Sequence, residues 1–289
     1  MFGRETVRRL IGIVASSGLV PVRLFPCTAT EQQSMEHVLE VYPKQKRDAA
    51  RLIATIIRIL KPKSSDLRVL EVGAAQGAFV IACNELGYFC RGIEPSENAL
   101  SISRVFAKAR NVGASIEKAA VEELPYADAT FDIVVALSVI EHVINVKKAF
   151  SEIFRVLKPR GAFYFWTANS LCPYQDEVRF FPFFSWYHDG VKQKVLLWTL
   201  RHRPSWVGYT KTPAINWFSP WKANTLLREA GFTEVWDRWS LLARGGESFK
   251  YASVNLIASR VARRIESTSF TRLWAEILVT GCGYLAIKT

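Results

Sequence analysis

The chain has 289 residues, of which 49% are hydrophobic and 22% are charged. This composition is sufficient for a full hydrophobic core and excludes an intrinsically disordered protein. No uninterrupted run of 18 apolar residues occurs, which argues against a membrane-spanning helix.

The net charge of +12 is unevenly distributed. Residues 1–63 carry 11 basic and 5 acidic side chains, residues 64–165 carry 11 and 12, and residues 166–289 carry 16 and 9. The middle of the chain is therefore neutral and both flanks are basic. Basic flanks beside apolar helical faces favour an anionic membrane surface or an acidic acceptor as partner, and the neutral middle argues against nucleic acid.

The N-terminal segment has an apolar run, residues 10–20, preceded by Arg4, Arg8 and Arg9. No small-x-small cleavage site follows closely, so an amphipathic surface helix is favoured over a removed signal peptide. The five cysteines are odd in number and contain no C-x-x-C pair, which favours a reducing compartment. We expect a cytoplasmic protein, with peripheral attachment to a membrane as an open alternative.

The periodicity of apolar residues changes along the chain. Residues 31–60 repeat at helical spacing, with a break or kink expected at Pro43. From there strands are predicted at 67–72, 88–93, 131–137, 161–166, from 232 onward and at 284–287, and helices at 77–86, 97–110, 146–157 and 220–230. This alternation predicts βαβ units and an α/β, Rossmann-like, doubly wound sheet that is mostly parallel.

Two segments interrupt the alternation. Residues 170–221 contain 13 aromatic residues, and residues 246–278 read as a basic helix. The predicted organisation is therefore a basic helical N-terminal extension over 1–63 and one domain over 64–289, with an aromatic insertion at 170–221 and a basic helical insertion at 246–278.

The turn after the first predicted strand combines a carboxylate with small residues, in the sequence Glu71-Val72-Gly73-Ala74-Ala75-Gln76-Gly77. Little side-chain bulk lets backbone amides and the following helix N-terminus approach a ligand. The second strand ends at Glu94, where an acid can accept hydrogen bonds from ribose hydroxyls. The G-x-G-x-x-G spacing of dinucleotide sites and the G-K-[ST] of a P-loop are both missing. A carboxylate at this turn repels phosphate and suits an ammonium or sulfonium ligand.

In four blocks the sequence resembles the class I S-adenosylmethionine-dependent methyltransferases, especially the small-molecule branch that includes quinone-biosynthesis enzymes. The blocks are residues 70–77, 92–96, 121–126, and 131–142 with 155–161. The resemblance extends from about Leu67 to Phe232, and the last strand, antiparallel in this family, fits it too. It implies an enzyme that uses S-adenosyl-L-methionine to methylate a small or lipid-like acceptor, with oxygen as the favoured acceptor atom.

Carried over residue by residue, the resemblance implies a cofactor site in three parts. Glu71, Gly73, Ala75 and Gly77 would shape the methionine pocket, and Leu137 would lie near the methionine amine. Glu94 would accept from the ribose hydroxyls, with Pro95 beside the adenine. The backbone at Val121 and Glu122 would meet the adenine edge.

Two residues depart from the family pattern. Ala75 replaces the usual middle glycine, which costs little if its φ is negative. Ala120 replaces an aspartate that often reaches the adenine amino group, so that this hydrogen bond is missing or made by Glu122. Both departures leave open a reduced cofactor affinity or a relative that does not bind the cofactor.

Methyl transfer to a hydroxyl is helped by a base, and the candidate is His142, just after the 131–137 strand. A packed histidine at a helix start is the equally weighted alternative. Ser138 stands where the quinone-type enzymes carry a further metal-holding acid, so no metal is predicted. For Glu141, charge pairing at a helix terminus is the favoured role.

The aromatic insertion could wall an acceptor site, although packing of each ring onto the sheet is favoured over ligand contact. The rings considered for this wall are Phe180, Phe181, Phe183, Phe184, Trp186, Tyr187, Trp217, Phe218 and Trp221.

Two other classes stay open. A nucleic-acid methyltransferase would fit the charge, but residues 137–140 lack a D/N-P-P-Y/F motif and a cysteine nucleophile. A non-catalytic protein with a vestigial pocket, kept for membrane or partner binding, is the other alternative.

Overall fold

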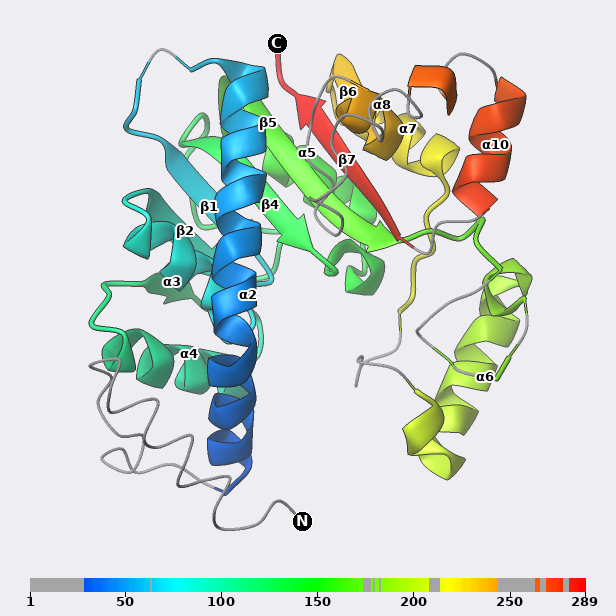
Figure 1. Cartoon of the computed structure of the whole chain (residues 1–289), viewed down its shortest axis with the longest axis horizontal. Coiled ribbons are helices and arrows are strands. Elements are labelled where there is room, and N and C mark those ends of the chain that lie inside the picture. Colours follow the sequence, from blue (N-terminus) through cyan, green and yellow to red (C-terminus); the bar gives the residue numbers. More distant parts are fainter. Residues whose placement is uncertain are drawn as a thin grey trace.

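The fold is described from a computed structural model of the chain (Figure 1). The structure describes residues 29–62, 64–173, 178, 180–181, 183–207, 214–243, 263–265, 269–277 and 281–289. The predicted surface helix at 10–20, and most of the predicted basic insertion at 246–278, lie outside the described residues.

A seven-stranded sheet with the strand order β3-β2-β1-β4-β5-β7-β6 forms the centre of the molecule. Strands β1 to β5 pair in parallel, whereas β7 runs antiparallel to both β5 and β6. The predicted doubly wound, mostly parallel sheet with an antiparallel last strand is confirmed. The strands are β1 (Arg68–Val72), β2 (Phe89–Ile93), β3 (Ser115–Glu117), β4 (Phe131–Leu137), β5 (Leu157–Ala168), β6 (Glu234–Asp237) and β7 (Gly281–Ile287).

Helices cover both faces of the sheet (Figure 1). On one face lie α2 (Ala29–Leu60), α3 (Ala78–Glu85) and α4 (Glu97–Ala109), and on the other lie α5 (Val146–Val156) and α7 (Pro220–Glu229). Successive strand residues point to opposite faces, so that Ile133 packs in the first core and Val134 in the second. This double burial explains why residues 133–136 of β4 are a continuous apolar run rather than an alternating one.

Helix α2 is continuous through Pro43, so the expected break is not there. Proline removes one backbone hydrogen bond of the helix, but apolar residues on both sides of it are buried in one core. Met35 and Val38 precede Pro43, and Ile53 and Ile56 follow it. Packing of both halves against α3 and α4 therefore outweighs the local cost.

Among the elements that sequence periodicity missed are strand β3, helix α6 and helix α8 (Arg238–Ala243). Strand β3 has only three residues and is half exposed, which is too short for an alternation to register. Helix α6 (Asp189–His202) lies inside the aromatic segment, where aromatic residues on several sides obscure a helical stripe. Within the described part of 246–278, residues 263–265 and α10 (Ser269–Ile277) are helical.

Candidate active site

The carboxyl ends of β1, β2 and β4 meet at one edge of the sheet. Val72 is in register with Ile93 of β2 and with Ala136 of β4. The next residues, Gly73, Glu94 and Leu137, therefore leave the sheet side by side. In open α/β sheets this edge is where ligands bind.

The glycine turn after β1 is tightly packed. Gly73 has φ +67°, and a Cβ added to it would lie 2.4 Å from Val139 Cγ2. Gly77 has φ +79°, and its Cβ would lie 2.5 Å from Ile116 Cδ1. Both positions thus require glycine for backbone conformation and for close approach.

Ala75 adopts a left-handed conformation with φ +45°, so the negative φ with which an alanine would cost little here is not present. The reason lies in its amide, which donates a 2.9 Å hydrogen bond to Glu94 Oε2. A non-glycine residue in this region is strained by roughly 1–2 kcal/mol. The turn therefore holds its shape at a conformational cost that the family's usual glycine avoids.

Glu94 is buried and held on both oxygens. Oε2 accepts from the Ala75 amide, and Oε1 accepts from the Ser96 amide at 2.9 Å. Its own amide donates to the Glu117 carbonyl of β3 at 3.0 Å. A carboxylate offers about four acceptor positions, so that the fixed side chain can still accept from two further donors such as vicinal hydroxyls.

Glu71 is buried on β1, directly below the turn, and its Oε2 has no hydrogen-bond partner. Burial raises the pKa of Glu71 to about 8, a hydrogen bond from the Val80 amide lowers it, and the charge of Glu94 raises it further. An unpartnered buried carboxyl oxygen is unusual in a folded protein. It is the group that a cationic ligand at this turn would satisfy.

The residues predicted to contact the adenine are Pro95, which follows β2, and Val121 and Glu122, which follow β3 in the chain. Val121 is buried in the same core as Val72 and Ile93, and Pro95 is exposed at the edge. Glu122 accepts through Oε1 from the amides of Ile144 and Asn145, at 3.1 and 3.3 Å. This carboxylate therefore ties the 121–124 segment to the start of α5.

His142 ends a short 3-10 helix, Ile140–His142, that follows β4. The preceding residue, Glu141, lies in the same short helix, where charge pairing was expected of it. It is buried, and its Oε2 accepts from the neutral Thr167 Oγ1 at 3.0 Å. The Glu141 carbonyl accepts from the amides of Ile215 and Asn216. The His142 segment is thus held by β5 and by the chain that returns from the aromatic insertion.

Asn216 is a residue that sequence reasoning missed. Its Nδ2 donates to the Val143 carbonyl at 2.6 Å, so that it bridges the insertion and the His142 segment. An isolated amide residue within an aromatic run was the available signal, since a polar side chain there needs a specific partner.

The aromatic residues of the insertion divide into packed and exposed groups. Phe184 is buried in a small cluster with Val178 and Leu196, and Phe218 packs on Phe165 of β5. Phe180, Phe183 and Trp186 are exposed. The buried rings hold the insertion together and attach it to the sheet, as favoured from the sequence.

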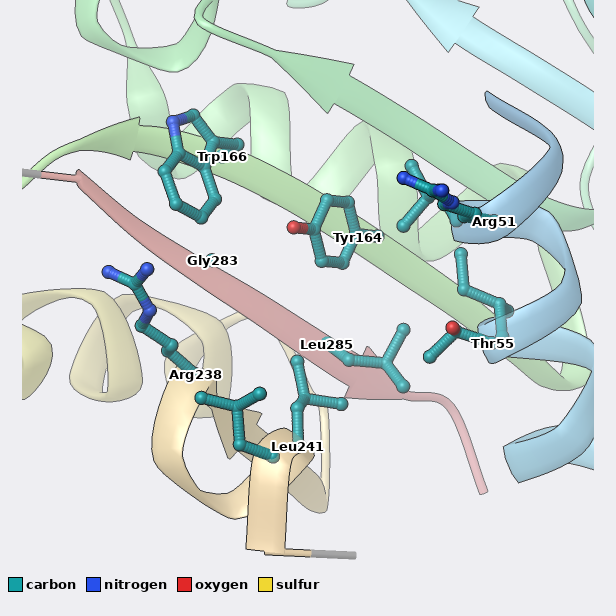
Figure 2. A pocket seen from close by; sticks show the side chains of 11 residues that line it. Arg51, Thr55, Tyr164, Trp166, Arg238, Leu241, Gly283 and Leu285 are labelled. Atoms are coloured by element: carbon teal, nitrogen blue, oxygen red, sulfur yellow. The ribbon is translucent and has the colours of Figure 1, made fainter. Parts of the chain in front are cut away.

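A small cavity lies on the α2 face of the sheet, away from the glycine turn (Figure 2). Arg51 and Thr55 of α2, Tyr164 of β5, and Arg238 and Leu241 line it together with residues of β7. Its volume is about 30 Å³, which accommodates a water molecule or two rather than a substrate. It is a packing gap between α2 and α8 (Arg238–Ala243).

Comparison with known proteins gives a consistent family. Residues 70–165 match the family model described as a methyltransferase domain. The segment is 33% identical over 112 residues to the ubiquinone biosynthesis O-methyltransferase of Rhizobium etli, covering 37% of this chain and 45% of that protein. An uncharacterized methyltransferase of Bacillus subtilis, YcgJ, is 31% identical over 97 residues, covering 33% of this chain and 38% of that protein. The match thus spans less than half of the length of either relative.

Solved structures extend the likeness of the fold. An S-adenosylmethionine-dependent methyltransferase from Mesorhizobium loti superposes with a TM-score of 0.50 at 16% identity, over 80% of this chain and 95% of that one. A proposed sarcosine dimethylglycine methyltransferase from Galdieria sulphuraria gives 0.52 at 16% identity, over 86% of each chain. Residues 70–165, which include the glycine turn and the acid after β2, are thus similar in sequence to a methyltransferase domain, and the chain has the fold of solved S-adenosylmethionine-dependent methyltransferases.

Proposed function

We propose that this protein transfers a methyl group from S-adenosyl-L-methionine to an oxygen of a small or lipid-like acceptor. The observation that carries the proposal is the pair of buried carboxylates on either side of the glycine turn. Glu94 is fixed to accept from hydroxyls, and Glu71 presents an oxygen without a partner. These groups suit a ligand that has both a ribose and a positive charge.

When bound, S-adenosyl-L-methionine supplies a methyl group on a positively charged sulfur. The protein's task is to align the acceptor and exclude water. In this proposal Glu71 and the turn from Gly73 to Gly77 hold the methionine part near Leu137. Glu94 accepts from the ribose hydroxyls, and Val121 lines the adenine.

His142 is the proposed base for the acceptor hydroxyl. It follows β4 at the same edge as Glu94, and Asn216 fixes the segment that carries it. A base placed there removes the hydroxyl proton as the oxygen attacks the methyl carbon. Substituting it should therefore affect methyl transfer and leave cofactor binding intact.

Titration calorimetry with S-adenosyl-L-methionine tests the cofactor site. Glu94→Gln should lower the affinity by at least tenfold, because it removes a charge-assisted pair of hydrogen bonds. Glu97→Gln is the matched control, since this nearby acid is exposed and pairs with Arg104 and Lys118 on the surface. No binding by the unmodified protein at millimolar cofactor would contradict the proposal and favour the non-catalytic alternative.

A membrane surface as a partner is supported by helix α6. Leu197 and Trp198 are 57% and 48% exposed, and Lys194 and Arg201 lie on the same side of the helix. An aromatic and apolar surface with flanking basic groups is typical of peripheral binding to anionic lipids. No helix among the described residues is long and apolar enough to cross a membrane.

Vesicle co-sedimentation tests this surface. The protein should bind phosphatidylglycerol vesicles more strongly than phosphatidylcholine vesicles, with loss at high salt. Trp198→Ala should weaken the binding, and Trp221→Ala, an exposed tryptophan on α7, is the control. Equal binding to both lipids would refute the electrostatic part of the proposal.

A further inference from the structure

A second and larger cavity lies between α7, β6, β7, α8 and α10, on the β6 side of the sheet. Its volume is about 340 Å³, within the range of roughly 300–1,000 Å³ typical of small-molecule sites. Two strands, β4 and β5, separate β7, which lines this cavity, from β1 at the glycine turn. The cavity is therefore distinct from the proposed cofactor site.

Tyr284 of β7 contributes the least expected group to this cavity. The residue is 1% exposed, and its hydroxyl has no hydrogen-bond partner. The thiol of Cys282 is near it, but that thiol donates to the Thr167 carbonyl at 3.8 Å. A buried hydroxyl without a partner costs roughly 1–3 kcal/mol, and a ligand hydroxyl in the cavity would satisfy it.

The charged groups of the lining balance one another. Asp237 is buried, pairs with Arg272, and accepts from the Ser240 amide at 2.9 Å. Glu276 is buried, and Arg228 stands on the α7 wall. The carboxyl groups of Asp237 and Glu276 repel an anionic ligand, and the guanidinium groups of Arg228 and Arg272 repel a cationic one. The lining therefore suits a neutral ligand that both donates and accepts hydrogen bonds.

Glu276 is the polar group that joins the cavity to the sheet edge. Its Oε2 accepts from Nδ2 of Asn169, the residue that follows β5, at 3.1 Å. Burial and the negative charge of Asp237 raise the pKa of Glu276 to about 7, against the opposing effect of Arg272. Near neutral pH this carboxyl group can thus donate a hydrogen bond or accept one.

Trp221 lies at the mouth of the cavity and is 59% exposed. An exposed indole beside a polar cavity offers a flat apolar face, against which the C–H face of a pyranose ring can stack. Asn224 lies on the next turn of α7 and also lines the cavity. Its Oδ1 accepts from Arg228 Nε at 3.3 Å, and its NH₂ group is a donor that a ligand hydroxyl can meet.

From this combination we infer that the cavity between α7 and α10 binds a neutral sugar ring, with Trp221 stacking on the ring and Tyr284, Glu276 and Asn224 bonding its hydroxyls. The inference goes beyond the proposed methyl transfer and does not depend on it. It names a glycosyl group as a ligand of this protein, whether free or as part of a larger molecule.

Saturation-transfer difference NMR with the methyl pyranosides of glucose, galactose, mannose and rhamnose tests the inference on the full chain. At least one glycoside should receive saturation at millimolar concentration. Tyr284→Phe and Trp221→Ala should each reduce that signal at least fivefold. Because the Tyr284 hydroxyl has no partner within the protein, Tyr284→Phe should not lower the melting temperature.

Trp198→Ala, on α6, is the matched control and should leave glycoside binding unchanged. Both cavity variants should retain the affinity of the unmodified protein for S-adenosyl-L-methionine, so failure here is distinguishable from failure of the methyl-transfer proposal. Absence of saturation with all four glycosides would overturn the inference. Glycoside binding that persists in both cavity variants would overturn it as well. So would saturation transfer to free indole but to none of the four glycosides.

Discussion

Replacing Glu71 by glutamine isolates the effect of a buried, ionisable group at the proposed cofactor site. In the unfolded chain this carboxyl group titrates near 4.5, and burial raises its pKa in the folded protein to about 8. Between these two values the unfolded state is ionised while the folded state must hold the proton. The protein therefore loses stability as the pH rises from 4.5 to 8, and the loss levels off above 8.

The shift sets the size of the effect. At about 1.36 kcal/mol per pKa unit, Glu71 should lower the free energy of unfolding by roughly 3–4 kcal/mol between pH 5 and pH 8. Glutamine carries no such proton. The difference in unfolding free energy, Glu71→Gln minus unmodified protein, should therefore grow by that amount over the same interval.

Urea denaturation at pH 5, 6.5 and 8 measures this difference. Glu97→Gln is the control, because Lys118 and Arg104 hold the pKa of that exposed acid below its usual value. Its carboxyl group is therefore ionised in both the folded and the unfolded state over most of this pH range, and the difference for this variant should stay nearly constant. Calorimetry in buffers of different ionisation enthalpy adds a second test. Binding of S-adenosyl-L-methionine at pH 7 should release a proton from the unmodified protein and not from Glu71→Gln. A stability difference that does not change with pH would refute the reasoning.

Three further substitutions probe the same edge. Gly73→Ala should destabilise the protein by about 2–4 kcal/mol, because the new side chain strains the backbone and overlaps with Val139. Gly87→Ala is the control and should cost only about 1 kcal/mol, since Gly87 has φ +88° and open space around it. Equal losses of unfolding free energy in the two variants would contradict the crowding at Gly73. Ala75→Gly should stabilise the protein by about 0.5 kcal/mol, because the relief of left-handed backbone strain exceeds the cost of the added freedom in the unfolded chain. A lower melting temperature of this variant would contradict the strain at Ala75. His142→Ala should reduce the rate at which S-adenosylhomocysteine is released in the presence of a hydroxylated acceptor at least a hundredfold. The affinity for the cofactor should stay unchanged. An unchanged rate of turnover would exclude His142 as the base.

The sheet was predictable because its strands are buried on both faces. The strand Phe131–Leu137 is apolar at every position except Asp132 and lies between amphipathic helices. This alternation of apolar strands and amphipathic helices by itself specifies a covered parallel sheet. Strand β3 and helix α6 were not predictable in this way, since three half-exposed residues and an aromatic-rich helix carry no clear period.

The place of the proposed cofactor residues at one edge of the sheet was predictable as well, because they lie at or just after the ends of strands. Register then brings Gly73, Glu94 and Leu137 together with no need for long-range information. The conformation of Ala75 was not predictable, since it depends on the hydrogen bond from its amide to Glu94, 19 residues away. The burial of Glu141 against Thr167 depends in the same way on how β5 lies beside β4.

The sequence by itself determined the sheet, its order of helices and strands, and the acids beside the glycine turn, because these depend on local spacing and on which residues are apolar. Only the tertiary structure decided which polar groups end without partners. Tyr284 in the second cavity is unexceptional in the sequence, and the sequence places Glu71 at the turn without showing that one of its oxygens lacks a partner. Their exposure and hydrogen bonding are set by residues distant in the chain, and it is this burial that gives them chemical significance.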